Sequence, residues 1–165
     1  MAVIIHWSPL LLDGLLRTLG LFFMALALEL VIAVVVGLAR LSRYRLVCVR
    51  ANAYMEVFRG ISLYVTLFWL YFALPFLGLR VSIWQAAVFG LALVHGAYAS
   101  EYVRGAIVTV SRDQYEAATA LNMSRYQRMR YVIFPQALVA MMPLFGNEFV
   151  MRLKGTSLAS LINLA

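Results

Sequence analysis

The sequence predicts an all-α membrane protein with about four transmembrane helices. Hydrophobic residues make up 64% of its 165 residues, and charged residues only 13%. Soluble domains are about 45–50% apolar and about 25% charged, so the apolar excess is too large for a water-soluble core. Because four long apolar runs fill most of the chain, we expect one transmembrane domain over residues 1–165 and no separate soluble domain.

Three of the apolar runs are regular enough to cross a bilayer. A hydrocarbon core about 30 Å thick needs roughly 20 apolar residues in a helix. Residues 18–39 supply such a run with one charge, Glu29, and residues 60–79 and 81–100 supply uncharged runs. We therefore expect three membrane-spanning helices in these ranges.

The fourth run, residues 131–151, is irregular in composition because it contains Pro135, Pro143, Gly146 and Glu148. Proline removes a helical hydrogen bond, and glycine weakens a helix interior. We therefore expect a bent or broken span here, and the residues that follow are too few for another crossing.

The basic residues predict the orientation. All but one of the 14 are arginines, and the formal net charge is +7. In a soluble protein this charge would favour nucleic acid as a partner, but in a membrane protein the positive-inside rule explains it better, and no nucleic acid is expected. The second connection holds only Arg80. The first and third connections hold Arg40, Arg43, Arg45, Arg50, Arg59, Arg104, Arg112, Arg125, Arg128 and Arg130. We therefore place those two connections in the cytoplasm and the N-terminus outside.

The third connection, residues 109–135, has the pattern of two short helices. Ser111 and Ser124 each precede a glutamine by three residues, which is the pattern of a capping box. Asn122 lies between the two helices and suits a left-handed C-cap. A basic helix of this kind either lies on anionic lipid or docks a cytoplasmic partner, and spacing alone leaves both readings open.

This connection resembles the EAA loop of ABC importer permeases. Glu116, Ala117 and Ala118 open the motif, and Pro135 closes it at the family's spacing. Asn122 stands where the family has glycine, and asparagine tolerates the positive φ that this position implies.

Further motifs resemble the polar amino-acid branch of these permeases (histidine/glutamine/arginine type). They are "YMEVFRGISL" (54–63), "GAYASEYVRGAI" (96–107) and "PQALVAMMPLFGNEFVMRLKGTSLASLI" (135–162). Ser62 and Gly155 depart from the branch's usual residues and look most similar to ectoine/hydroxyectoine permeases. The resemblance implies a type I ABC importer permease core with a cytoplasmic EAA coupling loop.

The resemblance also implies a function and its partners. The chain would be a multi-pass permease of the bacterial inner membrane that carries a polar amino acid or an ectoine-like solute. Its partners would be a cytoplasmic ATPase, a periplasmic or lipid-anchored solute-binding protein, a second permease (identical or related) and membrane lipids. ATP and Mg would bind to the ATPase, because this chain has no phosphate-binding P-loop and is expected to hold no cofactor.

Two sets of residues follow from this reading. The resemblance implies that the coupling residues seat in a cleft of the ATPase; they are Glu116, Ala117, Ala118, Asn122, Arg125, Arg128 and Pro135. Intramembrane polar groups are the candidates for the solute pathway: Asn147, Glu148, Lys154, Thr156 and Ser157. Lys154 would meet a solute carboxylate and Glu148 a positive end, unless these groups pair with each other or snorkel.

Other readings have less support. Two isolated histidines, His6 and His95, and one cysteine, Cys48, offer neither a catalytic constellation nor a metal site, so no enzyme is expected. His95 is expected to be a packed, hydrogen-bonded residue.

We expect Glu29 and Glu101 to pair with Arg59 or Arg104 between helices. A non-transporting membrane scaffold with a basic interfacial helix stays as the alternative function. Similar permeases continue through one more span, so we also expect a missing last helix and impaired transport by this form alone.

Overall fold

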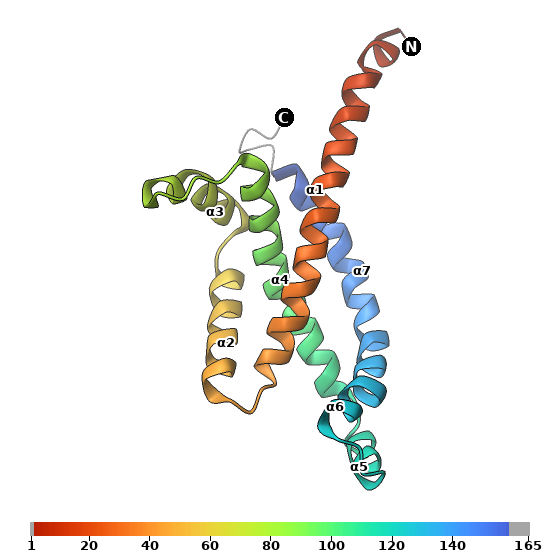
Figure 1. Cartoon of the computed structure of the whole chain (residues 1–165). Coiled ribbons are helices and arrows are strands. Elements are labelled where there is room, and N and C mark those ends of the chain that lie inside the picture. Colours follow the sequence, from red (N-terminus) through yellow and green to blue (C-terminus); the bar gives the residue numbers. More distant parts are fainter. Residues whose placement is uncertain (1, 159–165) are drawn as a thin grey trace.

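The computed structural model describes the backbone of residues 2–158 and, within it, the side chains of residues 12 and 14–151. Every regular element in this part of the chain is helical, which confirms the predicted all-α fold (Figure 1). The elements in chain order are α1 (Ala2–Arg40), α2 (Arg45–Gly60), α3 (Leu63–Phe68), the π-helical turn η1 (Trp69–Ala73), the 3₁₀ turn η2 (Leu74–Leu77), α4 (Ile83–Thr109), α5 (Arg112–Ala120), α6 (Arg125–Arg128), the π-helical turn η3 (Met129–Ile133) and α7 (Phe134–Leu158).

Three helical stretches in the described part of the chain are long and apolar enough to cross a membrane. They are Gly14–Arg40 in α1, Ile83–Thr109 in α4, and Arg125–Met151, which runs from α6 into α7. The first and third predicted spans are confirmed, although α4 continues beyond the predicted end at residue 100. This extension carries Glu101 and Arg104, which pair with each other, so the helix continues with its charges compensated.

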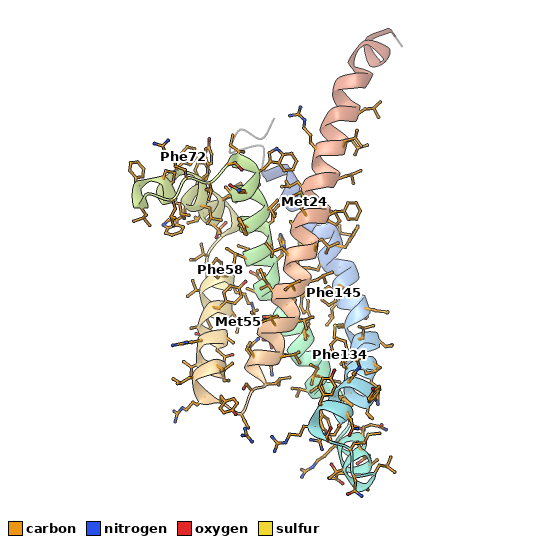
Figure 2. The ribbon with its side chains drawn as sticks, viewed as in Figure 1. Met24, Met55, Phe58, Phe72, Phe134 and Phe145 are labelled. Carbon is orange, nitrogen blue, oxygen red and sulfur yellow. The ribbon has the colours of Figure 1, made fainter. Side chains whose placement is uncertain are left out.

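The second predicted span, residues 60–79, does not form one membrane-spanning helix by itself. α2 ends at Gly60, and the chain bends by 103° before it continues as Leu63–Leu77. Ile61 (φ −101°, ψ 135°) and Ser62 (φ −63°, ψ 144°) are extended, so no helical hydrogen bonds cross this point. The segment from α3 to η2 projects sideways from the bundle and carries Phe72 (Figure 2).

The fourth predicted span is not broken into separate helices. α7 is one helix from Phe134 to Leu158, and Pro143 lies inside it. Pro135 directly follows the π-helical turn η3, so it lies inside the continuous helical stretch Arg125–Met151. The irregular span is therefore the second one, which counts as a crossing only if its two bent halves are taken together.

Each π-helical turn ends two residues before a proline. η1 ends at Ala73 before Pro75, and η3 ends at Ile133 before Pro135. A proline ring clashes with the carbonyl four residues earlier and has no N–H to offer it. The widened turn, with its hydrogen bonds five residues apart, leaves room for that ring without ending the helix.

α4 is the central helix, with α1 on one side and α7 on another (Figure 1). α1 and α4 approach closely at glycines. A Cβ added at Gly37 would lie 2.9 Å from the Cβ of Val103, and one at Gly96 would lie 2.8 Å from the Cγ2 of Ile32. Helices in lipid pack through small residues because van der Waals contact, not burial from water, drives their association.

Two apolar clusters fill the bundle, and a polar layer separates them. The first includes Ala25 and Leu91, and the second includes Ala33 and Ala99. Glu29 lies between the clusters on α1, and His95 lies between them on α4. α2 lies beside this layer and turns Met55 and Phe58 toward the rest of the bundle (Figure 2). Polar groups inside a membrane protein mark its functional region, so this layer is where a functional site is expected.

Candidate functional site

A cavity of about 580 Å³ opens at the break between α2 and α3. The extended residues Ile61 and Ser62 form one wall, because the chain leaves the helical path there and no turn of helix fills the space. α4 contributes Val94, His95, Tyr98 and Tyr102, and α7 contributes Glu148 and Met151. The volume lies within the range of about 300–1,000 Å³ that is common for small-molecule sites.

Glu148 of α7 is held by two side chains of α4. His95 Nδ1 lies 2.9 Å from Glu148 Oε1, and the hydroxyl of Tyr102 donates to Oε2 at 3.1 Å. Glu148 is 8% exposed and His95 is 9% exposed, so the pair is almost entirely enclosed. A buried carboxylate needs such partners, because its desolvation is costly without them.

Arg59, in the last turn of α2, brings a cation to the same cavity. Its guanidinium carbon lies 5.3 Å from the centre of the Tyr98 ring, which is a cation–π geometry. Among the side chains of residues 12 and 14–151, no carboxylate forms an ion pair with Arg59. The lining of the cavity therefore includes both a cation and an anion.

The structure brings together only part of the predicted solute pathway. Glu148 lines the cavity, whereas Asn147 is exposed on α7 and does not line it. The side chains of Lys154, Thr156 and Ser157 lie outside the described residues. His95 is packed and hydrogen-bonded, as predicted. Sequence reasoning missed that Arg59 and His95 line the same cavity as Glu148.

The predicted partners of Glu101 are half right. Arg104 donates to Glu101 from the same helix, with its Nε 3.1 Å from Oε1, and the interhelix partner is Arg40 of α1. Arg40 also donates through Nε to Asn52 Oδ1 of α2 at 2.6 Å. This network ties three helices together at the end of the bundle that carries α5 and α6. Glu29 is buried in the polar layer.

The predicted coupling segment lies at the end of the molecule opposite the N-terminus (Figure 1). The second capping box is confirmed: Gln127 N donates to Ser124 Oγ at 3.3 Å, and Ser124 N donates to Gln127 Oε1 at 2.9 Å. Asn122 has a φ of 53°, which confirms its left-handed conformation.

The first capping box is wrong, because Ser111 makes no side-chain cap. Gln114, which would complete it, instead accepts a hydrogen bond through Oε1 from Gln136 Nε2 of α7 at 3.2 Å. A tertiary contact thus replaces the local one, and it fastens α5 to the start of α7.

α5 and α6 are also fastened to each other. Arg128 donates to Thr119 Oγ1 at 2.7 Å and lies over the ring of Tyr115, 5.7 Å from its centre. The Tyr115 hydroxyl in turn donates to the carbonyl of Ile107 at 3.2 Å. Burial raises the pKa of Tyr115, and the charge of Arg128 acts in the opposite direction. The two short helices therefore form one unit rather than a loose loop.

The residues of the EAA motif face different ways. Ala118 is 2% exposed and packs inward, whereas Glu116 and Ala117 are exposed. Glu116 Oε1 lies 3.2 Å from Arg112 Nε in an exposed ion pair. Arg125 is exposed on α6, and Pro135 is exposed at the start of α7. Ala118 thus packs within this chain, whereas Glu116 and Ala117 are exposed and accessible to a partner.

Comparisons with known proteins agree with one another. The family model described as "Binding-protein-dependent transport system inner membrane component" matches residues 29–164. The solved structure titled "Crystal structure of an amino acid ABC transporter with histidines" superimposes with a TM-score of 0.90 at 34% identity. That match covers 99% of this chain and 76% of the other.

Relatives of similar sequence are named as permeases. A protein of Sinorhizobium fredii named "Probable amino-acid ABC transporter permease protein" is 51% identical over 134 residues, which are 78% of this chain and 56% of that protein. The glutamine transport system permease of Escherichia coli is 38% identical, over 95% of this chain and 73% of its own length. The nopaline transport system permease of Agrobacterium fabrum is 38% identical, over 98% of this chain and 71% of its own length. The chain thus spans little more than half of the Sinorhizobium protein and almost three quarters of the other two.

Proposed function

Because the chain belongs to the family of inner membrane components of binding-protein-dependent transport systems, we propose that it is the permease subunit of an ABC importer for a small zwitterion. Its fold is that of a type I ABC permease, and its family consists of transport proteins rather than enzymes. The bacterial inner membrane, with the N-terminus outside, is the proposed location; the arginine-rich connections support that orientation.

The cavity at the α2–α3 break is the observation that carries this proposal. A zwitterion needs a cation for its carboxylate and an acceptor for its ammonium group. Arg59 and Glu148 supply these two charges to one cavity, which is lined by residues of α2, α4 and α7. In a region of low dielectric such complementary charges act strongly, so the cavity favours a solute that carries both. Lys154, farther along α7, is proposed as a second cation for the carboxylate.

An α-amino acid is the proposed solute class. The names of the relatives, which include an amino-acid, a glutamine and a nopaline permease, support it. An ectoine-like solute is a narrower proposal that rests on Ser62 and Gly155. Of these, Ser62 lines the cavity. Both solute classes carry a carboxylate and a positive end, so one cavity chemistry serves either.

The α5–α6 unit is proposed as the element that docks the ATPase. It lies at the arginine-rich end of the bundle and is joined to α7 by the hydrogen bond between Gln114 and Gln136. This contact supports transmission of movement from a docked partner to the helix that carries Glu148. ATP and Mg would bind to the ATPase, a solute-binding protein would dock at the opposite end, and a second permease would complete the pathway.

Copurification and a solute panel test this function. The protein is coexpressed with an ABC ATPase and a solute-binding protein from the same organism, and the complex is reconstituted into liposomes. We expect the ATPase to copurify, and L-glutamine, L-arginine or ectoine to stimulate ATP hydrolysis. A chain that inserts well but captures no ATPase, and whose liposomes respond to none of these solutes, would favour the membrane-scaffold alternative.

A further inference from the structure

The segment Leu63–Leu77, which comprises α3, η1 and η2 and which we call the lateral arm, projects sideways from the bundle (Figure 1). One face of the arm packs on the bundle. Leu67 of this face is 1% exposed and shares an apolar cluster with Leu21 of α1 and Leu91 of α4. A Cβ added at Gly90 would lie 2.6 Å from Leu67 Cδ2, so the arm and α4 are in close contact. These contacts fix the direction of the arm.

The rest of the arm's surface is aromatic and exposed. Trp69 is 53% exposed and Phe76 is 91% exposed, and the rings of Phe68 and Phe72 stack with their centres 5.4 Å apart. Two hollows, of about 510 and 460 Å³, lie on this surface and share Phe72 and Phe76 as lining residues. An exposed apolar surface of this kind marks an interaction site, because water is an unfavourable neighbour for it.

The level of the arm in the membrane follows from the two helices that it contacts. The arm leads into α4 at Ile83, and Glu101, which pairs with Arg40, lies about 27 Å farther along α4 at 1.5 Å per residue. This length matches the hydrocarbon core of about 30 Å, so the charged pair and the arm lie at opposite boundaries of it. α1 indicates the same level, because Leu21 lies one turn from Arg17, which flanks the apolar run of α1.

The arm runs along the membrane rather than across it. The chain bends by 103° between α2 and the arm. Because α2 runs alongside α4 in the bundle (Figure 1), a segment bent by this angle lies near the plane of the bilayer surface. Tryptophan and tyrosine are enriched at this boundary, where the ring meets lipid and its polar atom meets water. Tyr64 and Trp69 supply such side chains to the exposed surface of the arm.

Arg80 adds a cation beside the aromatic surface. Its side chain is exposed and lines the smaller hollow together with Phe72 and Phe76. No acidic residue occurs between Glu56 and Glu101 in the sequence, and among the described side chains no carboxylate forms an ion pair with Arg80. A guanidinium binds a phosphate group through two parallel hydrogen bonds. A phosphate from outside the chain therefore fits this position.

We propose that the lateral arm binds a phospholipid at this boundary of the membrane, with the phosphate on Arg80 and an acyl chain against the aromatic surface. One molecule then accounts for both features, because a phospholipid joins an anionic group to an apolar chain. This interaction goes beyond the proposed transport function and does not depend on which solute is carried.

A second copy of the chain fits the arm less well than a lipid does. Helices in lipid associate through small residues such as glycine, alanine and serine, which let the backbones approach closely. The arm instead exposes the large rings of Tyr64, Phe68, Trp69, Phe72 and Phe76.

Fluorescence quenching locates the arm in the bilayer. Trp7→Phe and Trp84→Phe leave Trp69 as the single tryptophan of the full chain. The protein is reconstituted into vesicles of phosphatidylethanolamine and phosphatidylglycerol that are brominated either near the headgroup or near the end of the acyl chain. We expect stronger quenching by bromine near the headgroup. The control carries Val31→Trp as its single tryptophan, at an exposed position in the middle part of α1, and bromine near the chain end should quench it more strongly.

Binding of a lipid is measured at the same tryptophan. Brominated phosphatidylglycerol is titrated into the detergent-solubilised protein, and quenching of Trp69 reports a lipid at the arm. Arg80→Gln should raise the apparent dissociation constant by about tenfold or more, because a charge-assisted hydrogen bond is lost. Phe76→Ser should also weaken binding, and this variant should fold normally because Phe76 is 91% exposed. Arg50→Gln, in the half of α2 farther from the arm, is the matched control and should keep the wild-type constant.

Three results would overturn the proposal. Absent quenching of Trp69 in vesicles would show that protein, such as a second copy, covers the arm, and stronger quenching by bromine near the chain end would place the arm too deep. An unchanged dissociation constant in Arg80→Gln would remove the phosphate contact. Inorganic phosphate should compete no better than sodium chloride of equal ionic strength, and stronger competition would assign Arg80 to a free anion instead of a lipid. Solute uptake is measured separately, so each of these failures leaves the transport function standing.

Discussion

The guanidinium of Arg40, at the end of α1, forms an ion pair with the carboxylate of Glu101 in α4. The Arg40 side chain is only 7% exposed, and that of Glu101 is 29% exposed. Arg40 also bonds Asn52 of α2, so one enclosed cation joins three helices. The stability of this enclosed guanidinium depends on the Glu101 carboxylate, because water has little access to solvate the charge in its place.

Glu101→Gln should therefore destabilise the bundle. Removing one partner of a buried pair costs about 3–5 kcal/mol, and partial exposure of Glu101 should reduce this to roughly 2 kcal/mol. The melting temperature of the purified protein in detergent measures the loss. Glu116→Gln is the matched control, because its pair with Arg112 is 68% and 90% exposed and should contribute no more than about 1 kcal/mol. Equal melting temperatures for the two variants would contradict a clamping role for Arg40 and Glu101.

Gly37→Ala should weaken the α1–α4 contact. The added Cβ would lie 2.9 Å from Val103 Cβ and 3.0 Å from the Ser100 carbonyl, and overpacking of this kind costs about 1–3 kcal/mol. Gly105→Ala on α4 is the control, since its Cβ meets nothing within 4 Å. The control should be neutral or slightly stabilising, because alanine favours a helix. Thermal unfolding of both variants checks this, and a stable Gly37→Ala protein would show that the two helices are free to separate.

Glu116→Lys should uncouple transport while the protein still inserts into the membrane. Glu116 is exposed on the proposed docking unit, and a lysine there adds positive charge beside Arg112. We expect less copurified ATPase and no solute-stimulated ATP hydrolysis, at wild-type expression. Glu56→Lys, at an exposed position of α2 away from this unit, should keep both activities. Wild-type uptake by a well-expressed Glu116→Lys protein would refute the docking role.

The sequence predicted well those features that depend only on residues adjacent in the chain. The spans at residues 18–39 and 81–100, the cap at Ser124 and the positive φ of Asn122 all follow from local composition or geometry. The break at Ile61 and Ser62 was missed because an apolar run does not reveal whether its helix continues.

Contacts between distant segments were not predictable in the same way. Gln114 leaves its local cap for Gln136, and His95 meets Glu148, only because α7 packs against α5 and α4 in one particular register. A sequence without related sequences beside it gives the residue types at these positions but not that register. For this reason Glu148 was identified as a pathway residue, whereas Arg59 and His95 were not recognised as its neighbours in the cavity.

Solute uptake by paired charge variants tests the central claim most directly, namely that a zwitterion passes between Arg59 and Glu148. Uptake and solute-stimulated ATP hydrolysis are measured in liposomes that contain the permease, its ATPase and its binding protein. Glu148→Gln and Arg59→Gln should each raise the KM for the solute by about tenfold or more, because each leaves one solute charge without a partner in a partly dry cavity. Arg50→Gln, at an exposed position of the same helix as Arg59, should leave the KM unchanged. A wild-type KM in both Glu148→Gln and Arg59→Gln would contradict the account.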